Sequence, residues 1–317
     1  MRFLSSIFFI LGLASVHAYA FETDQFTLPP EPLKDVGTEL NQLVLTAVNQ
    51  AIAEANTKQD FSETDLADRV HHHLCSNITL CEPEAWAAQT TNFKPALWES
   101  IHKGVFAPIP FAFLFDSPTI NVFGVYLGTD KIGHFFAQGY GYYETFMKAI
   151  GNGLSEEAAI RKTVQEGINE ERSYFGYWPA GTYSNADLAA DYAGFKFYLN
   201  LTRTVRMGEV WMVPAIVEKE NNSLKLSGDV NAETLLNAFM DERFNEALNP
   251  SMHIFSRAKL RKAVRARCAR WIQEFQMSRE SVEAKIKELS TWHGEDYGYH
   301  LDPSYAITLA TECYSNP

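Results

Sequence analysis

Residues 128–140 read Gly128-Thr129-Asp130-Lys131-Ile132-Gly133-His134-Phe135-Phe136-Ala137-Gln138-Gly139-Tyr140. Asp130 and His134 are four residues apart, so on a helix their side chains project from one face, and Gln138 continues that line. The other residues are nearly all apolar or small, which predicts a helix that is packed on most sides. A buried Asp–His pair needs partners, because an unpaired charge in the core is very costly.

Helical periodicity extends outward from this stretch over most of the chain. It predicts helices at about 37–57, 62–73, 130–149, 156–174, 185–203, 231–247, 256–276 and 279–291. Residues 209–228 are the one convincing place for β structure. The strand-like runs Val210-Trp211-Met212-Val213 and Ser223-Leu224-Lys225-Leu226-Ser227 flank the turn-prone Asn221-Asn222 there. The apolar but proline-interrupted run 104–128 predicts a buried core segment, with membrane-surface contact as the alternative. We therefore expect a mainly α, helical bundle-like single domain over residues 36–317, with at most a small β hairpin.

The composition excludes several classes of protein. The chain has 317 residues, 46% of them hydrophobic, which is ordinary for a globular protein with a sizeable core. Its net charge of −12 argues against a nucleic-acid binder, because phosphate contacts need a basic face.

The N-terminus and the cysteines indicate an exported protein. Arg2 precedes an apolar run, and Ala18-Tyr19-Ala20 supplies the small residues that a signal peptidase reads, so residues 1–20 predict a secretory signal cleaved near Ala20. An uncleaved anchor is the alternative. Residues 21–35 are Pro-rich and predict an extended N-terminal arm. The four cysteines predict the disulfides 75–81 and 268–313, although Cys268 lies on an apolar helix stripe and could be a buried free thiol.

Acidic residues on two later helices join the candidate site. Glu171 stands where the apolar periodicity of the helix 156–174 requires a core residue; the alternative is an acid at the edge of the stripe, paired with Arg172 or Arg161. Asp187 and Asp191 lie one turn apart on the next helix. Two such carboxylates repel each other unless a cation, a proton or a basic partner lies between them.

Two of these acids also have simpler structural explanations. Asp130 could complement the helix dipole in a first turn, and Asp187 could form a capping box with Ser184. Neither explanation accounts for His134 or Asp191.

Together these residues predict a polar site within residues 128–200. As a metal site it would use Asp130, His134, Asp187 and Asp191, a donor set that suits Zn²⁺, Mn²⁺ or Mg²⁺ and could generate hydroxide. Without a metal, His134, Glu171 and Asp130 are the candidate catalytic residues for acid–base chemistry. The third alternative is a structural polar network that holds three helices in register.

At these residues the chain resembles the VanZ-like proteins and a related family of small exported envelope proteins typified by YfiM. The likeness rests on Asp130-Lys131-x-x-His134-Phe135, a later acid, and Asp187-Leu188-x-x-Asp191-x-x-Gly194, and it covers about residues 128–200. Asp191 stands where the family usually has Asn, which adds a negative charge to the site. The resemblance implies an envelope location and a polar site. It implies no reaction, because the biochemical activity of the family is not established.

Two functions follow as expectations. The first is an exported hydrolase, metal-dependent or acid–base, that acts on an envelope or extracellular substrate in the periplasm or outside the cell. The second is a non-catalytic envelope binding or immunity-type protein whose polar network is structural. Envelope lipid, glycan or protein are the candidate partners, and the basic helix face 257–270 is either solvated or in contact with anionic lipid or the acidic remainder of the protein.

Overall fold

The computed structural model describes residues 22–58, 62–77, 80–106, 116–209 and 211–314. The helices of this part of the chain are α2 (Gly37–Lys58), α3 (Glu63–Leu74), α4 (Glu82–Gln89), α5 (Thr129–Gly133), the π-helix η2 (His134–Gln138), α6 (Gly139–Gly151), α7 (Glu156–Glu171), α8 (Asn185–Asn200), the 3-10 helix η3 (Glu242–Phe244), α9 (Arg257–Arg265), α10 (Cys268–Phe275), α11 (Arg279–Leu289) and α12 (Leu309–Cys313). The strands are β1 (Cys75–Asn77), β2 (Leu80–Cys81), β3 (Thr119–Val122), β4 (Val125–Gly128), β5 (Thr182–Tyr183), β6 (Val205–Met207), β7 (Trp211–Val213), β8 (Val217–Glu220), β9 (Ser223–Leu226) and β10 (Met252–His253). The predicted signal sequence, residues 1–20, lies outside the described residues.

The fold is mixed α/β, so the expected mainly α bundle with at most one hairpin is wrong. Within the described residues, five two-stranded antiparallel sheets form: β1–β2, β3–β4, β5–β10, β6–β7 and β8–β9. The predicted turn at Asn221-Asn222 joins β8 to β9, and both asparagines have positive φ, as a tight hairpin requires. The predicted first strand of this hairpin is wrong, because Trp211–Val213 pairs with β6 as β7 and the strand before the turn is β8. The other strands are two to four residues long, too short for an alternation of apolar and polar residues to be recognised.

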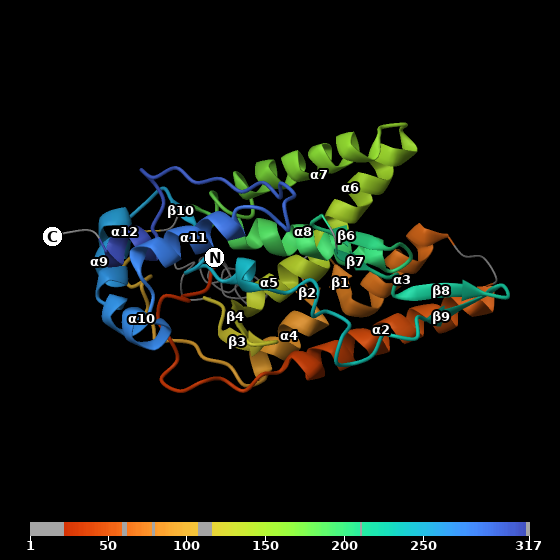
Figure 1. Ribbon diagram of the computed structural model, residues 1–317, viewed down its shortest axis with the longest axis horizontal. Coiled ribbons are helices and arrows are strands. Elements are labelled where there is room, and N and C mark those ends of the chain that lie inside the picture. Colours follow the sequence, from red (N-terminus) through yellow and green to blue (C-terminus); the bar gives the residue numbers. More distant parts are fainter. Residues whose placement is uncertain (1–21, 59–61, 78–79, 107–115, 210, 315–317) are drawn as a thin grey trace, which may run out of the picture.

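Helix α8 is the central element of the molecule (Figure 1). Every residue from Asn185 to Asn200 is buried. A helix that is covered on all sides has no polar face to give to solvent, so its charged residues must find partners inside the protein. Helices α6 and η2 pack along it, and this packing brings the stretch 128–140 against Asp187 and Asp191.

Other helices form where the sequence predicts them. Helix α2 buries a stripe that includes Leu40, Val44, Val48 and Ala51, and α7 and α11 also match their predicted ranges closely. The predicted helix 256–276 is divided into α9 and α10. Of the predicted core segment 104–128, Ile120, Val122 and Leu127 are buried, Phe106 is exposed, and residues 107–115 lie outside the described part of the chain.

The predicted helix 231–247 does not form. Its apolar residues have helical spacing, yet the segment consists of turns and the short η3. Side chains take the backbone N–H groups that a helix would use: Asn41 accepts from the N–H of Leu236, and Gln25 accepts from the N–H of Glu246. These long-range contacts satisfy the backbone without a helix, which local periodicity does not reveal.

The core has two parts. The larger cluster surrounds α8, and a smaller one lies among α9, α10, α11 and α12, at one end of the molecule in Figure 1. Phe26 and Leu28, from the predicted arm 21–35, are buried in the smaller cluster. This part of the arm therefore belongs to the packed fold.

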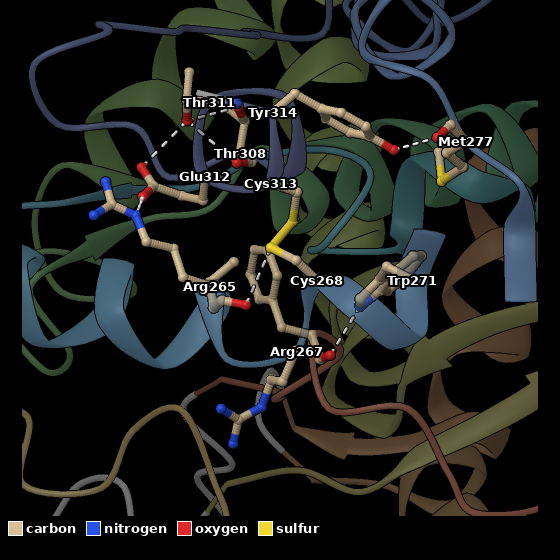
Figure 2. Close-up of a disulfide and its surroundings, with 12 residues drawn as sticks. Arg265, Arg267, Cys268, Trp271, Met277, Thr308, Thr311, Glu312, Cys313 and Tyr314 are labelled. Carbon is tan, nitrogen blue, oxygen red and sulfur yellow. Dashed lines mark hydrogen bonds and ion pairs between the residues drawn. A yellow bond between two sulfur atoms is a disulfide. The ribbon is translucent and has the colours of Figure 1, made fainter. Parts of the chain in front are cut away.

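Both predicted disulfides are present, so the free-thiol alternative for Cys268 is excluded. Cys75 bonds to Cys81 within the β1–β2 sheet. Cys268 of α10 bonds to Cys313 of α12, and Figure 2 shows this second disulfide. Two disulfides fit an exported protein. Among the described residues, no helix combines the length and apolar character needed to span a bilayer.

Candidate functional site

His134 begins a π-helical turn inside an otherwise α-helical segment. α5, η2 and α6 follow one another without a loop from Thr129 to Gly151. Such π turns are often found at functional sites, because the extra residue turns side chains out of regular helical register. The turn lies against α8, with His134 directed at the two aspartates of that helix.

Two carboxylates hold the imidazole of His134, one at each nitrogen. Nδ1 lies 2.8 Å from Oδ1 of Asp191, and Nε2 lies 3.5 Å from Oδ2 of Asp187. The predicted convergence of these three residues is therefore present. The ring of Phe175 stands edge-on to the imidazole, with 6.2 Å between ring centroids. His134 keeps 16% of its side chain exposed, against 5% for Asp187 and 8% for Asp191, so it is the most accessible of the three.

These contacts set the protonation of the pair. Burial by itself lowers the pKa of His134, but the charges of Asp187 and Asp191 outweigh burial and raise this pKa to about 10. Burial raises the pKa of Asp191 to about 6, although His134 acts in the opposite direction. The imidazole therefore carries its proton at neutral pH.

Lys131 neutralises a second group of acids. Its ammonium lies 2.6 Å from Oδ2 of Asp130 and in direct contact with Asp187 and Glu246, and its side chain is fully buried. Burial lowers the pKa of Lys131, but the three carboxylates outweigh burial and hold the pKa well above its usual range. Asp187 thus joins the two groups, because one of its oxygens faces Lys131 and the other faces His134.

Asp130 does not pair with His134 as the spacing predicts. Its two oxygens contact Lys131 and the hydroxyl of Thr23, which donates a hydrogen bond of 2.8 Å. Burial raises the pKa of Asp130, but the charge of Lys131 outweighs burial and lowers it. The side chain is thus part of a buried ion-pair network, which goes beyond the simple helix-dipole explanation.

Glu171 is buried at the end of α7 and fixes the start of α8. Its carboxylate accepts a hydrogen bond of 2.7 Å from the backbone N–H of Ser184, so it neither reaches solvent nor pairs with an arginine. Burial, with the charge of Asp187, raises the pKa of Glu171 well above its usual range. The neighbouring Glu170 is partly exposed and accepts a hydrogen bond from Tyr174.

Three acids of the cluster come from outside residues 128–200 and were not predicted. Glu246 lies in the segment mistaken for a helix, and burial raises its pKa to about 7. Glu84 of α4 packs on the backbone of Gly133, and burial with the charge of Asp130 raises its pKa to about 8. Burial and the charge of Glu246 raise the pKa of Glu22 well above its usual range.

Little in the sequence points to these three acids. Glu22 belongs to the polar run 22–25, which is completely buried and has no periodicity to indicate burial. Lys131 gives the clearer signal, because a lysine on a mostly apolar helix needs an acidic partner when it is buried.

The predicted four-ligand metal set is not gathered around one point. Among the described residues, a different group has the spacing of metal ligands. It consists of Asp130, Asp187 and Glu246, whose ligand atoms all lie within 4.8 Å of one another. These hard oxygen donors could hold a divalent ion. The ammonium of Lys131, however, already lies among the same three carboxylates, so an ion there would have to displace or compete with it. His134 and Asp191 belong to the adjoining pair.

Comparisons of the chain with protein-family models, curated proteins and solved structures give no significant match.

Proposed function

We propose that the protein is an exported hydrolase that uses acid–base chemistry at His134. The observation that carries this proposal is an imidazole held at both nitrogens by buried carboxylates while part of its ring remains exposed. Orienting a proton-carrying group at an accessible point is what general acid catalysis needs. Because the imidazole is protonated at neutral pH, His134 donates its Nε2 proton, which Asp187 holds only at 3.5 Å, to the leaving group. Asp191, with a pKa of about 6, accepts a proton from the attacking water.

The other residues support this pair. Asp187 orients the imidazole and is itself held by Lys131, which also balances Asp130 and Glu246. Glu171 fixes the first turn of α8, from which Asp187 and Asp191 project. In this scheme Asp130 and Glu171 are positioning residues, and a Zn²⁺, Mn²⁺ or Mg²⁺ ion at Asp130, Asp187 and Glu246 is the metal-dependent variant of the proposal.

The proposed location is the cell envelope or the medium, after cleavage near Ala20. The two disulfides support export, and the VanZ-like and YfiM-type resemblance of residues 128–200 supports an envelope location. The substrate is then an envelope or extracellular molecule with a bond that a proton donor can help to cleave.

The test is a hydrolysis screen of purified protein with chromogenic esters, phosphate esters and glycosides, comparing wild type with His134→Gln. His72→Gln, at an exposed histidine of α3, is the matched control. We expect the activity of His134→Gln to fall by about 100-fold or more, the range of general acid catalysis, and that of His72→Gln to stay unchanged.

Elemental analysis of protein purified without chelator tests whether a metal takes part. About one divalent ion per chain favours the metal-dependent variant of the proposal, and a stable protein without metal excludes that variant.

A non-catalytic envelope protein is the second candidate. It is favoured by the complete burial of Lys131, whose ammonium joins α5, α8 and the segment that carries Glu246. If the polar network is structural, His134→Gln should cost several kcal/mol of stability while no substrate of the screen is hydrolysed.

A further inference from the structure

Helix α9, which lies at the end of the molecule away from α2 in Figure 1, carries a basic surface. We define the basic patch by six side chains: Lys103, Arg257, Lys259, Arg261, Lys262 and Arg265. Five of them belong to α9, a helix of nine residues that contains no acid. In a chain with a net charge of −12, such a concentration of positive charge on one helix is a strong local asymmetry.

Most of this charge is not neutralised within the described part of the protein. Glu312 of α12 pairs with Arg265 at 2.8 Å and with Arg261 at 3.4 Å, and Figure 2 shows the Arg265 contact. Lys259 and Arg257 instead donate to backbone carbonyls, and Arg257 also lies over the ring of Tyr305, 4.6 Å from its centroid, so neither cation has a carboxylate partner among the described residues. Lys103 and Lys262 are exposed. One carboxylate therefore faces six cations.

Exposed aromatic rings accompany these cations. Phe106 is 61% exposed and Phe255 37%, and their rings meet edge to face with 5.4 Å between centroids. The backbone N–H of Phe106 donates to the hydroxyl of Ser256, the residue that precedes α9, so the two rings lie at the start of the basic helix. Large apolar rings in water are unfavourable unless something covers them.

The surface between the cations is hollowed. A cavity of about 710 Å³ is lined by Arg257, Lys259, Arg261 and Arg265, among others. Arginine and lysine around such a space suit a phosphate group. In the sequence, Phe106 is followed by nine residues without a polar side chain, residues 107–115, which lie outside the described part of the chain.

We propose that the basic patch and the Phe106–Phe255 pair bind the surface of a membrane that contains anionic phospholipid. The cations meet the phosphate headgroups and the two rings enter the interface, the combination by which peripheral proteins bind lipid surfaces. The two exposed apolar rings favour a lipid interface over nucleic acid, because contacts to a nucleic-acid backbone need cations and polar groups but no apolar rings. This inference concerns a surface apart from His134 and does not depend on the proposed hydrolase activity.

The test is co-sedimentation of the purified protein with vesicles of phosphatidylcholine, with and without phosphatidylglycerol. We expect binding to the vesicles that contain phosphatidylglycerol, little to phosphatidylcholine alone, and weaker binding as salt is raised. The combined variant Lys103→Gln, Lys259→Gln, Lys262→Gln should bind about 100-fold more weakly, since each charge near an anionic surface contributes about fivefold. Phe106→Ser with Phe255→Ser should weaken binding about tenfold or more.

The matched controls lie on other faces of the protein. Lys148→Gln, Arg161→Gln, Lys162→Gln removes three exposed cations from α6 and α7, and Trp211→Ser removes an exposed ring from β7. These elements lie away from α9 in Figure 1, so both variants should bind as wild type does. Circular dichroism and thermal melting verify that each variant folds. Equal binding to both kinds of vesicle, or equal loss in the controls, overturns the proposal. So does a patch variant that changes only the oligomeric state in sedimentation velocity, because the surface would then contact a second copy of the chain.

Discussion

Gly139 and Gly194 bring the backbones of α6 and α8 into direct contact, since a Cβ atom added at Gly139 would lie 2.7 Å from Cα of Gly194. This close approach sets the candidate site. Asp191 lies nearly one turn before Gly194 on α8, and His134 lies five residues before Gly139 on the segment that packs against it. The Asp191–His134 hydrogen bond therefore depends on a contact that only glycine allows.

The first prediction concerns this contact. A Cβ at Gly194 would lie 1.9 Å from the carbonyl oxygen of Phe135, so Gly194→Ala should force α8 and η2 apart and cost about 3 kcal/mol or more of unfolding free energy. Gly141→Ala is the control, because nothing lies within 4 Å of its added Cβ, and it should be neutral or stabilising by up to about 1 kcal/mol. Urea denaturation measures both. Equal stability of the two variants would disprove the close packing.

The second prediction concerns Lys131. Lys131→Met keeps the length of the side chain and removes its charge, leaving Asp130, Asp187 and Glu246 buried without their cation. We expect a loss of about 3–5 kcal/mol at neutral pH, partly recovered in acid as the carboxylates take up protons. Lys148→Met, at an exposed position of α6, should change the stability little. A stable Lys131→Met protein would mean that the three acids are protonated or bound to another cation.

The third prediction concerns pH. The folded protein raises the pKa of Asp191 to about 6, of Glu246 to about 7, of Glu84 to about 8 and of His134 to about 10. Each of these groups binds its proton more tightly in the folded than in the unfolded state, so each contributes stability that is present in acid and lost as pH rises through the folded pKa. The free energy of unfolding should therefore fall between about pH 5 and about pH 9.

Two variants separate the contributions to this slope. Glu84→Gln should flatten the slope below about pH 8, and His134→Gln should flatten it between about pH 6.5 and about pH 10, the interval between its unfolded and folded pKa values. Urea titrations at several pH values give the slope. A protein that becomes more stable from about pH 5 to about pH 9 would contradict the prediction, because the lowered pKa of Asp130 affects stability only below the usual aspartate pKa of about 4.

The fourth prediction concerns the disulfides. Cys268 and Cys313 are 45 residues apart, whereas Cys75 and Cys81 are 6 residues apart. The 268–313 disulfide therefore restricts the unfolded chain more than the 75–81 disulfide does. Replacing the first pair by serine should cost about 4 kcal/mol and the second about 2 kcal/mol on the loop-entropy scale. Denaturation of both double variants measures the difference. A larger cost for the 75–81 pair would assign its stabilising effect to the folded state.

Local periodicity was sufficient for much of the fold. Helices α2 and α7 follow from stripes of apolar residues, and the turn between β8 and β9 follows from its two asparagines. The segment 231–247 has an equally helical pattern and is not a helix, because its N–H groups bond to Asn41 and Gln25. The short strands β1 to β7 and β10 carry too few residues to show a pattern.

The sequence by itself indicated the two cysteine pairs, with a free Cys268 as the alternative, and determined that Asp187 and Asp191 share one helix face, since they are four residues apart. Their contact with His134 required the packing of η2 against α8. The tertiary structure alone decided which cation the acids share. Lys131 takes Asp130 away from His134, and Glu22, Glu84 and Glu246 reach the cluster from distant segments. The physical reason is that a buried carboxylate must find a proton or a cation wherever the packed chain provides one, and sequence spacing carries no information about such long-range contacts.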